Sequence, residues 1–118
     1  MLVVDDIAEI TELLSFYLAS RGYEIARAYN GRQAIDKALF FRPHVIVLNL
    51  MMPLMSGDKA AGYLRAHPAT QGAKIIMTSG FPFYEDLCLS AGADAFLSKP
   101  FSMRDLDALL SRLLSEGV

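Results

Sequence analysis

The sequence is poor in cysteine and has no apolar run of membrane-spanning length, and each scarcity excludes a class of protein. The single cysteine, Cys88, excludes an internal disulfide, and its apolar neighbours predict a buried small side chain rather than a reactive thiol. The longest apolar stretch is interrupted at Asn49 and Pro53, well short of the roughly 20 residues that a membrane span needs. No basic leader with a small-residue cleavage site opens the chain. We therefore expect a cytoplasmic protein that does not enter a membrane.

An excess of basic residues is also missing. The chain has 11 Lys and Arg against 13 Asp and Glu, which gives a formal net charge of −2 and a pI near 5.6. The basic residues are scattered rather than clustered, so no electrostatic footprint for a phosphate backbone is evident. We expect no direct contact of this chain with nucleic acid.

The 118 residues are 53% hydrophobic and alternate short apolar runs with amphipathic segments of helix length. A chain of this size and composition can bury the core of one domain. The pattern predicts strands at 1–4, 23–28, 45–50, 74–79 and 95–98. It predicts helices from Ile7 to Arg21, between Gly31 and Pro43, and near 58–66, 84–91 and 103–114, the last opened by a Ser102 to Asp105 capping box.

Strict alternation of five strands and five helices is typical of a parallel sheet with right-handed crossovers, that is, a doubly wound α/β sandwich of three layers. In such sheets the polar site gathers beyond the carboxyl ends of the strands. Four kinds of polar side chain stand at those ends, namely the carboxylates of Asp5 and Asp6, the carboxamide of Asn49, the hydroxyls of Thr78 and Ser79, and the ammonium group of Lys99. We expect them to converge on one crevice, where the adjacent acids suggest a hard-metal site of magnesium type.

Each polar residue also has a simpler interpretation. Asp6 suits the N-cap of the first helix, Lys99 could be a solvated lysine at a strand end, and Ser79 with Gly80 could be a turn. His44 and His67 lack metal-ligand spacing and are expected on the surface. The methionine-rich segment LMMPLM (50–55) is expected to fill gaps in the core.

Four segments taken together resemble the receiver domains of bacterial two-component response regulators, of the chemotaxis type. The segments are LVVDD (2–6), VIVLNLMMPLMSG (45–57), IIMTSG (75–80) and GADAFLSKPF (92–101). The resemblance covers essentially the whole chain, so we expect residues 1–118 to form one receiver domain, compatible with excision from a longer regulator or hybrid kinase. It implies a flavodoxin-like (βα)5 fold with the strand order 2-1-3-4-5.

The resemblance also implies roles for individual residues. Asp5 and Asp6 would hold Mg²⁺ together with the backbone carbonyl of Met51. Ser79 and Lys99 would contact the phosphoryl oxygens, Phe96 would be the aromatic switch residue and Gly80 would keep access to the phosphoryl group open. The Lys99-Pro100 bond would be cis. No organic cofactor and no enzymatic activity are implied.

Asn49 departs from the family pattern, because receivers carry a phospho-accepting aspartate at this position. A carboxamide has no charged oxygen with which to attack phosphorus, so we expect no phosphorylation of this chain. Mg²⁺ binding should be weakened, although the amide oxygen remains a candidate ligand, and Lys99 is free to pair with Asp5 or Asp6. The sequence allows two origins, a natural receiver that signals without phosphorylation and an ordinary receiver carrying an engineered Asp-to-Asn change.

As a receiver, the chain is expected to act by changing its protein partners, a histidine kinase or another signalling protein. The face formed by segments near 84–91, 95–98 and 103–114 would make these contacts and would allow a homodimer. A flavodoxin-like flavin carrier is the first competing interpretation, but no phosphate-binding loop follows the first strand. A phosphohydrolase with Asp5 or Asp6 as nucleophile is the second, and it would leave the rest of the receiver pattern unexplained.

Overall fold

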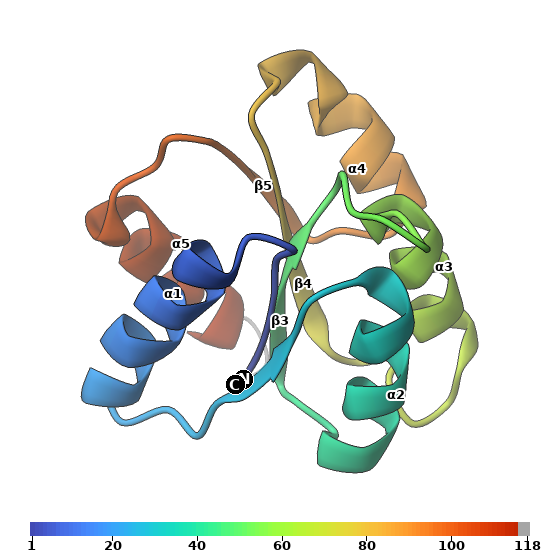
Figure 1. Cartoon of the computed structure of the whole chain (residues 1–118), viewed down its shortest axis with the longest axis horizontal. Coiled ribbons are helices and arrows are strands. Elements are labelled where there is room, and N and C mark those ends of the chain that lie inside the picture. The colour runs from blue at the N-terminus through green and yellow to red at the C-terminus, as the bar shows by residue number, and fades with distance from the viewer. Residues whose placement is uncertain (116–118) are drawn as a thin grey trace.

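The computed structural model describes residues 1–115 and shows a five-stranded parallel sheet with helices on both faces (Figure 1). The strands, in the spatial order β2-β1-β3-β4-β5, are β1 (Leu2–Val4), β2 (Ala26–Ala28), β3 (Val45–Asn49), β4 (Lys74–Ser79) and β5 (Ala95–Ser98). The helices are α1 (Ala8–Ser20), α2 (Gly31–Phe41), α3 (Gly57–Ala66), α4 (Glu85–Ala91) and α5 (Met103–Ser115), and the 3₁₀ turn η1 (Pro82–Tyr84) precedes α4. The predicted fold class and strand order are confirmed.

The sheet separates two hydrophobic clusters, because successive strand residues point to opposite faces. Val3 faces the helices α1 and α5, with Leu14 and Leu110 among its cluster. Leu2 and Val4 face α2, α3 and α4 on the other side. Figure 1 shows this division, with α1 and α5 on the left of the sheet and the other helices on its right. The central strand β3 is buried along its whole length, as its continuous apolar run predicts.

The second strand is shorter than predicted, because only Ala26–Ala28 of the expected 23–28 pair with a neighbour. β2 lies at the edge of the sheet and has β1 as its one partner strand. β1 consists of Leu2–Val4, whose residues align one to one with Ala26–Ala28. The alternating pattern of the sequence correctly indicated a strand, but only its last three residues pair with β1.

The predicted capping box at the start of α5 is confirmed, whereas the simpler interpretation of Asp6 as an N-cap does not hold. The capping box of α5 is present, with the backbone N–H of Asp105 donating to Ser102 Oγ at 3.0 Å and the N–H of Ser102 donating to Asp105 Oδ2 at 3.2 Å. Asp6 is not the N-cap of α1, because Ile7 occupies that position. The neighbouring Asp5 accepts the N–H of Ile7 on Oδ1 at 3.0 Å, so its carboxylate is the one turned towards the start of the helix.

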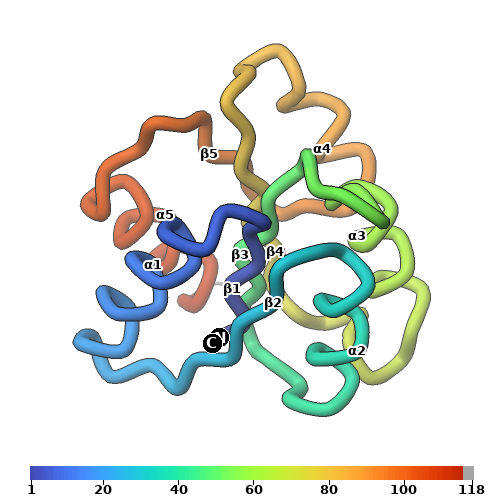
Figure 2. Tube along the Cα trace, in the orientation of Figure 1, coloured from blue at the N-terminus to red at the C-terminus, as the bar shows by residue number. Residues whose placement is uncertain are grey.

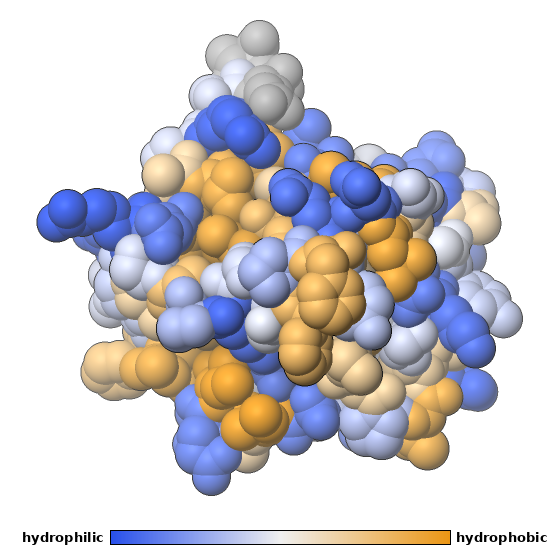
Figure 3. Space-filling view, turned by 90° about the horizontal axis from the view of Figure 1, so that it is seen from above, coloured by the Kyte–Doolittle hydropathy of each residue, from blue (hydrophilic) through white to orange (hydrophobic). Residues whose placement is uncertain are grey.

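The methionine-rich segment was predicted to fill the core, which is confirmed for Leu50, Met52 and Met55 but is wrong for Met51 and Leu54. Leu50 is buried, but Met51 and Leu54 are 56% and 86% exposed in the loop after β3. Apolar side chains therefore stand among polar ones on the face seen from above, at the carboxyl ends of the strands (Figure 3). His44 and His67 are exposed, as expected.

Within residues 1–115, no helix combines the length and the apolar character that crossing a membrane requires.

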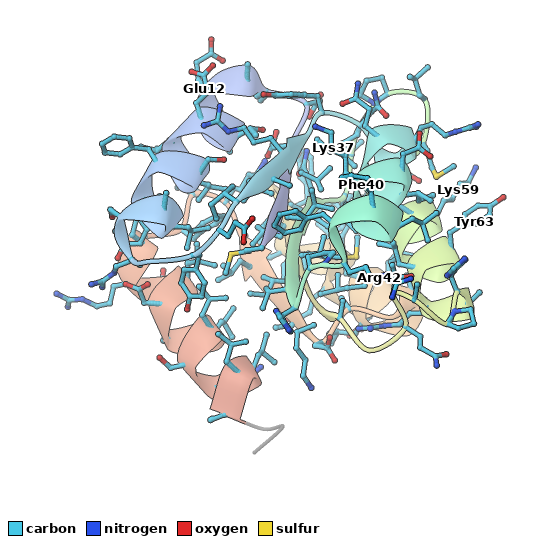
Figure 4. All side chains as sticks on the ribbon, turned by 90° about the horizontal axis from the view of Figure 1, so that it is seen from below. Glu12, Lys37, Phe40, Arg42, Lys59 and Tyr63 are labelled. Atoms are coloured by element: carbon cyan, nitrogen blue, oxygen red, sulfur yellow. The ribbon has the colours of Figure 1, made fainter. Side chains whose placement is uncertain are left out.

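Exposed side chains of α2 and α3 lie together on one side of the molecule (Figure 4). They include Phe40, 93% exposed, and Tyr63, 62% exposed, next to Lys37 and Lys59. This side of the molecule is separate from the polar edge of the sheet and offers positions for control substitutions.

The thiol of Cys88 is expected to be inert in the native protein. Cys88 lies on the inner face of α4, and its side chain is fully buried. This burial, with a smaller contribution from Asp58, raises the pKa of the thiol to about 11. Because the thiolate is the reactive form, about one thiol in a thousand is ionised at pH 8. A maleimide should label the native chain at least about 100-fold more slowly than the urea-unfolded chain at pH 8. Mass spectrometry measures the two labelling rates. Equal rates for the native and the urea-unfolded chain would contradict the described packing of α4.

Arg65 at the end of α3 joins three segments of the chain. Its guanidinium donates to the carbonyl of Gly92 at 2.9 Å, to the carbonyls of Gln71 and Ala73, and to Asp94 Oδ2 at 2.6 Å. Asp94 in turn accepts the N–H of Ile75 at the start of β4 at 2.8 Å. The planar fork of arginine makes all these bonds possible from one side chain.

Arg65→Ala is expected to lower the free energy of unfolding by about 2 kcal/mol. It removes several hydrogen bonds donated by the charged guanidinium group, which is partly exposed to water. Urea denaturation followed by circular dichroism measures the change. Arg32→Ala, at an exposed position on α2, should alter the stability by no more than about 0.5 kcal/mol. Equal stability of the two variants would mean that the Arg65 bonds contribute nothing.

Candidate functional site

The predicted polar residues meet at one edge of the sheet, because the strands are parallel and their carboxyl ends point the same way. Asp5 and Asp6 follow β1, Asn49 is the last residue of β3, Ser79 is the last of β4, and Lys99 follows β5. Figure 2 shows the end of β1 (dark blue) beside the end of β3 (green) in the middle of the trace. The fold therefore brings segments distant in sequence to one place.

The carboxamide of Asn49 lies at the centre of this site and is 6% exposed. Its Nδ2 donates to Asp6 Oδ1 at 3.2 Å and to the backbone carbonyl of Met51 at 3.1 Å. Its Oδ1 accepts from Lys99 Nζ at 3.2 Å and from the hydroxyl of Thr78 at 3.5 Å. The opposite orientation of the amide would set oxygen against two oxygens and NH₂ against an ammonium, so its surroundings fix the orientation.

Asp5 is buried and forms an ion pair with Lys99, with 2.8 Å between Oδ2 and Nζ. Its other carboxylate oxygen accepts the N–H of Ile7, and its backbone carbonyl accepts the hydroxyl of buried Thr11 at 2.8 Å. The expectation that Lys99 pairs with one of the two acids is confirmed, and the partner is Asp5. A buried carboxylate needs such a partner, because desolvation penalises an unpaired charge.

Ser79 is buried at the end of β4 but makes no hydrogen bond to Asn49. Its Oγ accepts the N–H of Phe81 at 3.1 Å, and its backbone carbonyl accepts the N–H of Lys99 at 2.7 Å. The hydroxyl that reaches Asn49 is that of Thr78, which pairs with Asn49 across β3 and β4. Thr78 was expected in the crevice beside Ser79, but its contact with Asn49 was not predicted, although aligning the two parallel strands would have indicated it.

The remaining predicted residues lie around this centre. Phe96 is half-buried in β5 and packs against the cluster beneath α2, α3 and α4. Gly80 is exposed, with nothing within 4 Å of where a Cβ would be. The Lys99-Pro100 peptide is cis, as expected. Met51 turns its carbonyl towards Asn49 while its side chain is exposed.

Gly57, the first residue of α3, holds the start of this helix against the end of β3. Its N–H donates to the carbonyl of Leu50 at 2.6 Å. A Cβ at this position would lie 2.2 Å from the backbone oxygen of Asn49. The absence of a side chain at Gly57 is therefore a condition for the observed position of Asn49.

The fold and the site together define a doubly wound α/β protein of the flavodoxin-like class, with acids after the first strand and a lysine after the last. The sequence model of the response regulator receiver domain matches residues 1–111. The chain belongs to this receiver family, as the four motifs indicated. Receivers are signalling modules of two-component systems rather than conventional enzymes.

Curated relatives include a transcriptional regulatory protein and a DNA-binding response regulator. The alkaline phosphatase synthesis transcriptional regulatory protein PhoP of Bacillus subtilis is 33% identical over 114 residues, which is 97% of this chain and 48% of PhoP. The DNA-binding response regulator MtrA of Mycobacterium tuberculosis is 36% identical over 110 residues, 92% of this chain and 47% of MtrA. The chain thus spans about half the length of these relatives. Their names give no support to the expectation that nucleic acid is not a partner.

Two similar solved structures contain magnesium. The response regulator TrrA of Thermotoga maritima, in complex with Mg²⁺ and BeF, has a TM-score of 0.81 and 37% identity, and the match covers 95% of this chain and 96% of TrrA. The receiver domain of a sensor histidine kinase of Pseudomonas aeruginosa, with a magnesium ion in its active-site cleft, has a TM-score of 0.86 and 27% identity. The match covers 94% of this chain and 93% of that receiver domain.

Proposed function

We propose that this chain is a receiver whose phosphoacceptor position is occupied by Asn49, so that it signals through protein contacts without being phosphorylated. The observation that carries the proposal is the position of the Asn49 carboxamide, which ends β3 between Asp6, Lys99 and the Met51 carbonyl. In this assignment Asp5, Asp6 and the Met51 carbonyl correspond to the metal-binding set of the family. Ser79, Lys99, Phe96 and Gly80 correspond to its switch and phosphate-contacting residues.

The chemistry of the amide accounts for the lack of phosphorylation. Transfer of a phosphoryl group from a kinase histidine needs a nucleophilic oxygen, and a carboxylate supplies one because it carries a full negative charge. The amide oxygen of Asn49 carries no full charge, and its nitrogen lone pair is delocalised into the carbonyl. Lys99 still lies 3.2 Å from this oxygen, so the site keeps the cation of a receiver but lacks its nucleophile.

The donor set of the chain does not fit a divalent ion as it stands. Within residues 1–115, no group of three His, Cys, Asp or Glu side chains is placed to hold a metal. One carboxylate oxygen of Asp6, Oδ1, and the backbone carbonyl of Met51 both accept from the NH₂ of Asn49. We therefore assign no step of the function of this chain to Mg²⁺.

Partner binding is assigned to the face formed by α4, β5 and α5. Exposed apolar side chains near its edge, among them Phe83, Leu87 and Leu89, support this assignment. The partner would be a histidine kinase or another signalling protein, and a homodimer through the same face is a second mode. In both cases residues 1–118 act as one receiver domain, within or outside a longer protein.

A competition experiment tests the proposal. A histidine kinase that transfers its labelled phosphoryl group to Asn49→Asp should transfer none to the unaltered chain. The unaltered chain should nevertheless compete for that kinase and slow the labelling of the variant. Labelling of the unaltered chain would contradict the loss of the acceptor. Labelling of the variant at an unchanged rate in the presence of excess unaltered chain would contradict the protein-contact mode.

A further inference from the structure

We propose that the NH₂ group of Asn49 and the ammonium group of Lys99 together take the place of the divalent ion, so that the site is closed and independent of metal. This inference rests on the assignment of the site as that of a receiver. It goes further by giving Asn49 a positive role, since the amide does more than remove a nucleophile. It holds the loops of the site in one arrangement.

The amide nitrogen of Asn49 is the first of the two substitutes. Asp6 Oδ1, after β1, and the Met51 carbonyl, after β3, converge on this one nitrogen at 3.2 and 3.1 Å. An NH₂ group has two hydrogens, so it can serve both acceptors at once. The two loops are thereby joined by a neutral donor, as they would be by an ion bound to the same two oxygens.

The ammonium group of Lys99 is the second substitute. It lies 2.8 Å from Asp5 Oδ2 and 3.2 Å from Asn49 Oδ1, and so joins the segment after β5 to β1 and β3. The other oxygen of Asp5 accepts the N–H of Ile7. The amide oxygen, a candidate metal ligand from the sequence, is thus turned towards Lys99 and Thr78, away from Asp6 and Met51.

Each oxygen named here already accepts a hydrogen bond from nitrogen. An ion that bound Asp6 Oδ1 and the Met51 carbonyl would have to displace the amide NH₂ from both, and it would gain no third carboxylate in return. Mg²⁺ also gives up its hydration water reluctantly. The network therefore favours the ion-free site beyond what the loss of one negative charge explains.

Asn49→Ala separates these two causes of weak metal binding. The substitution adds no charge, but it removes the NH₂ that covers Asp6 and the Met51 carbonyl. If the amide blocks the site, Asn49→Ala binds a divalent ion more tightly than the unaltered chain. If the missing charge is the whole cause, alanine binds no better than asparagine.

The probe is Mn²⁺, measured by the loss of its free-ion electron paramagnetic resonance signal, because the chain has no tryptophan to report binding by fluorescence. We expect the unaltered chain to bind Mn²⁺ at least about tenfold more weakly than Asn49→Ala. Asn49→Ser is the second variant should the alanine chain not fold by circular dichroism. Equal Mn²⁺ affinity of the unaltered chain and these variants would overturn the inference.

Lys99→Met tests the second substitute and is expected to raise Mn²⁺ affinity at least about threefold, because it frees Asp5 Oδ2 and Asn49 Oδ1. Its matched control is Lys37→Met, at an exposed lysine of α2 (Figure 4), which should leave the affinity unchanged. Equal affinities of Lys99→Met and Lys37→Met would overturn the part played by Lys99. Tight Mn²⁺ binding by the unaltered chain would end this inference alone, whereas a phosphoryl adduct on that chain would end the proposed function.

Discussion

Asn49→Asp is expected to lower the free energy of unfolding by about 2 kcal/mol in the presence of a chelator. The substitution replaces an NH₂ donor by a charged oxygen that faces Asp6 Oδ1 and the Met51 carbonyl at about 3 Å. A third acid then shares a site in which Lys99 already neutralises Asp5. Two like charges about 4 Å apart at an effective dielectric of about 20 repel by about 4 kcal/mol, and the exposure of Asp6 reduces this penalty.

Thermal unfolding in chelator and in excess Mg²⁺ measures this prediction. The midpoint of Asn49→Asp should lie on the order of 5–10 °C below that of the unaltered chain in chelator and should rise when Mg²⁺ is added. Asn30→Asp makes the same chemical change at the N-cap of α2, where a carboxylate is favourable. This control should keep or slightly raise the midpoint. An equal fall of the thermal midpoint in Asn49→Asp and Asn30→Asp would indicate a general effect of net charge. It would contradict the described network.

Gly57→Ala is expected to lower the free energy of unfolding by about 3 kcal/mol or more. The new Cβ would lie 2.2 Å from the carbonyl oxygen of Asn49 and 3.0 Å from Leu50 Cα, and both are backbone atoms at a buried strand end. Neither can move without displacing β3, so the start of α3 must shift. The shift also moves the carboxamide of Asn49, and chemical shift changes of the Asn49 side-chain amide in NMR spectra should report it.

Gly62→Ala provides the matched control on the same helix. Gly62 lies in the middle of α3, and nothing is within 4 Å of the position of an added Cβ. Alanine has the higher helix propensity, so this variant should gain about 0.5–1 kcal/mol. Urea denaturation of both variants gives the two values. A Gly57→Ala chain as stable as the unaltered one would contradict the close approach of α3 to β3.

Much of the fold could be predicted from the sequence, because the apolar runs and their separators determine the elements one by one. The strands at 74–79 and 95–98 have the predicted bounds. The shortening of β2 and the choice between Asp5 and Asp6 at the start of α1 could not be predicted in the same way. The first depends on which residues pair with a strand distant in sequence, and the second on which of two adjacent acids faces the helix.

For the site, the sequence predicted which residues gather but not how they bond. The convergence of Asp5, Asp6, Asn49 and Lys99 follows from their places at parallel strand ends. The orientation of the Asn49 amide depends on hydrogen bonds to four neighbours in four segments. A local sequence pattern therefore cannot predict it. The exposure of Met51 could not be predicted either, since hydrophobicity alone does not separate a core residue from one at the mouth of a site.

The central claim is that a carboxamide at the end of β3 prevents covalent activation of an otherwise complete receiver site. Intact-mass spectrometry of the unaltered chain and Asn49→Asp, side by side with acetyl phosphate and Mg²⁺, tests it most directly. We predict the mass of one phosphoryl group on Asn49→Asp and none on the unaltered chain. A phosphoryl adduct on the unaltered chain, or none on the variant while it is folded, would contradict the account.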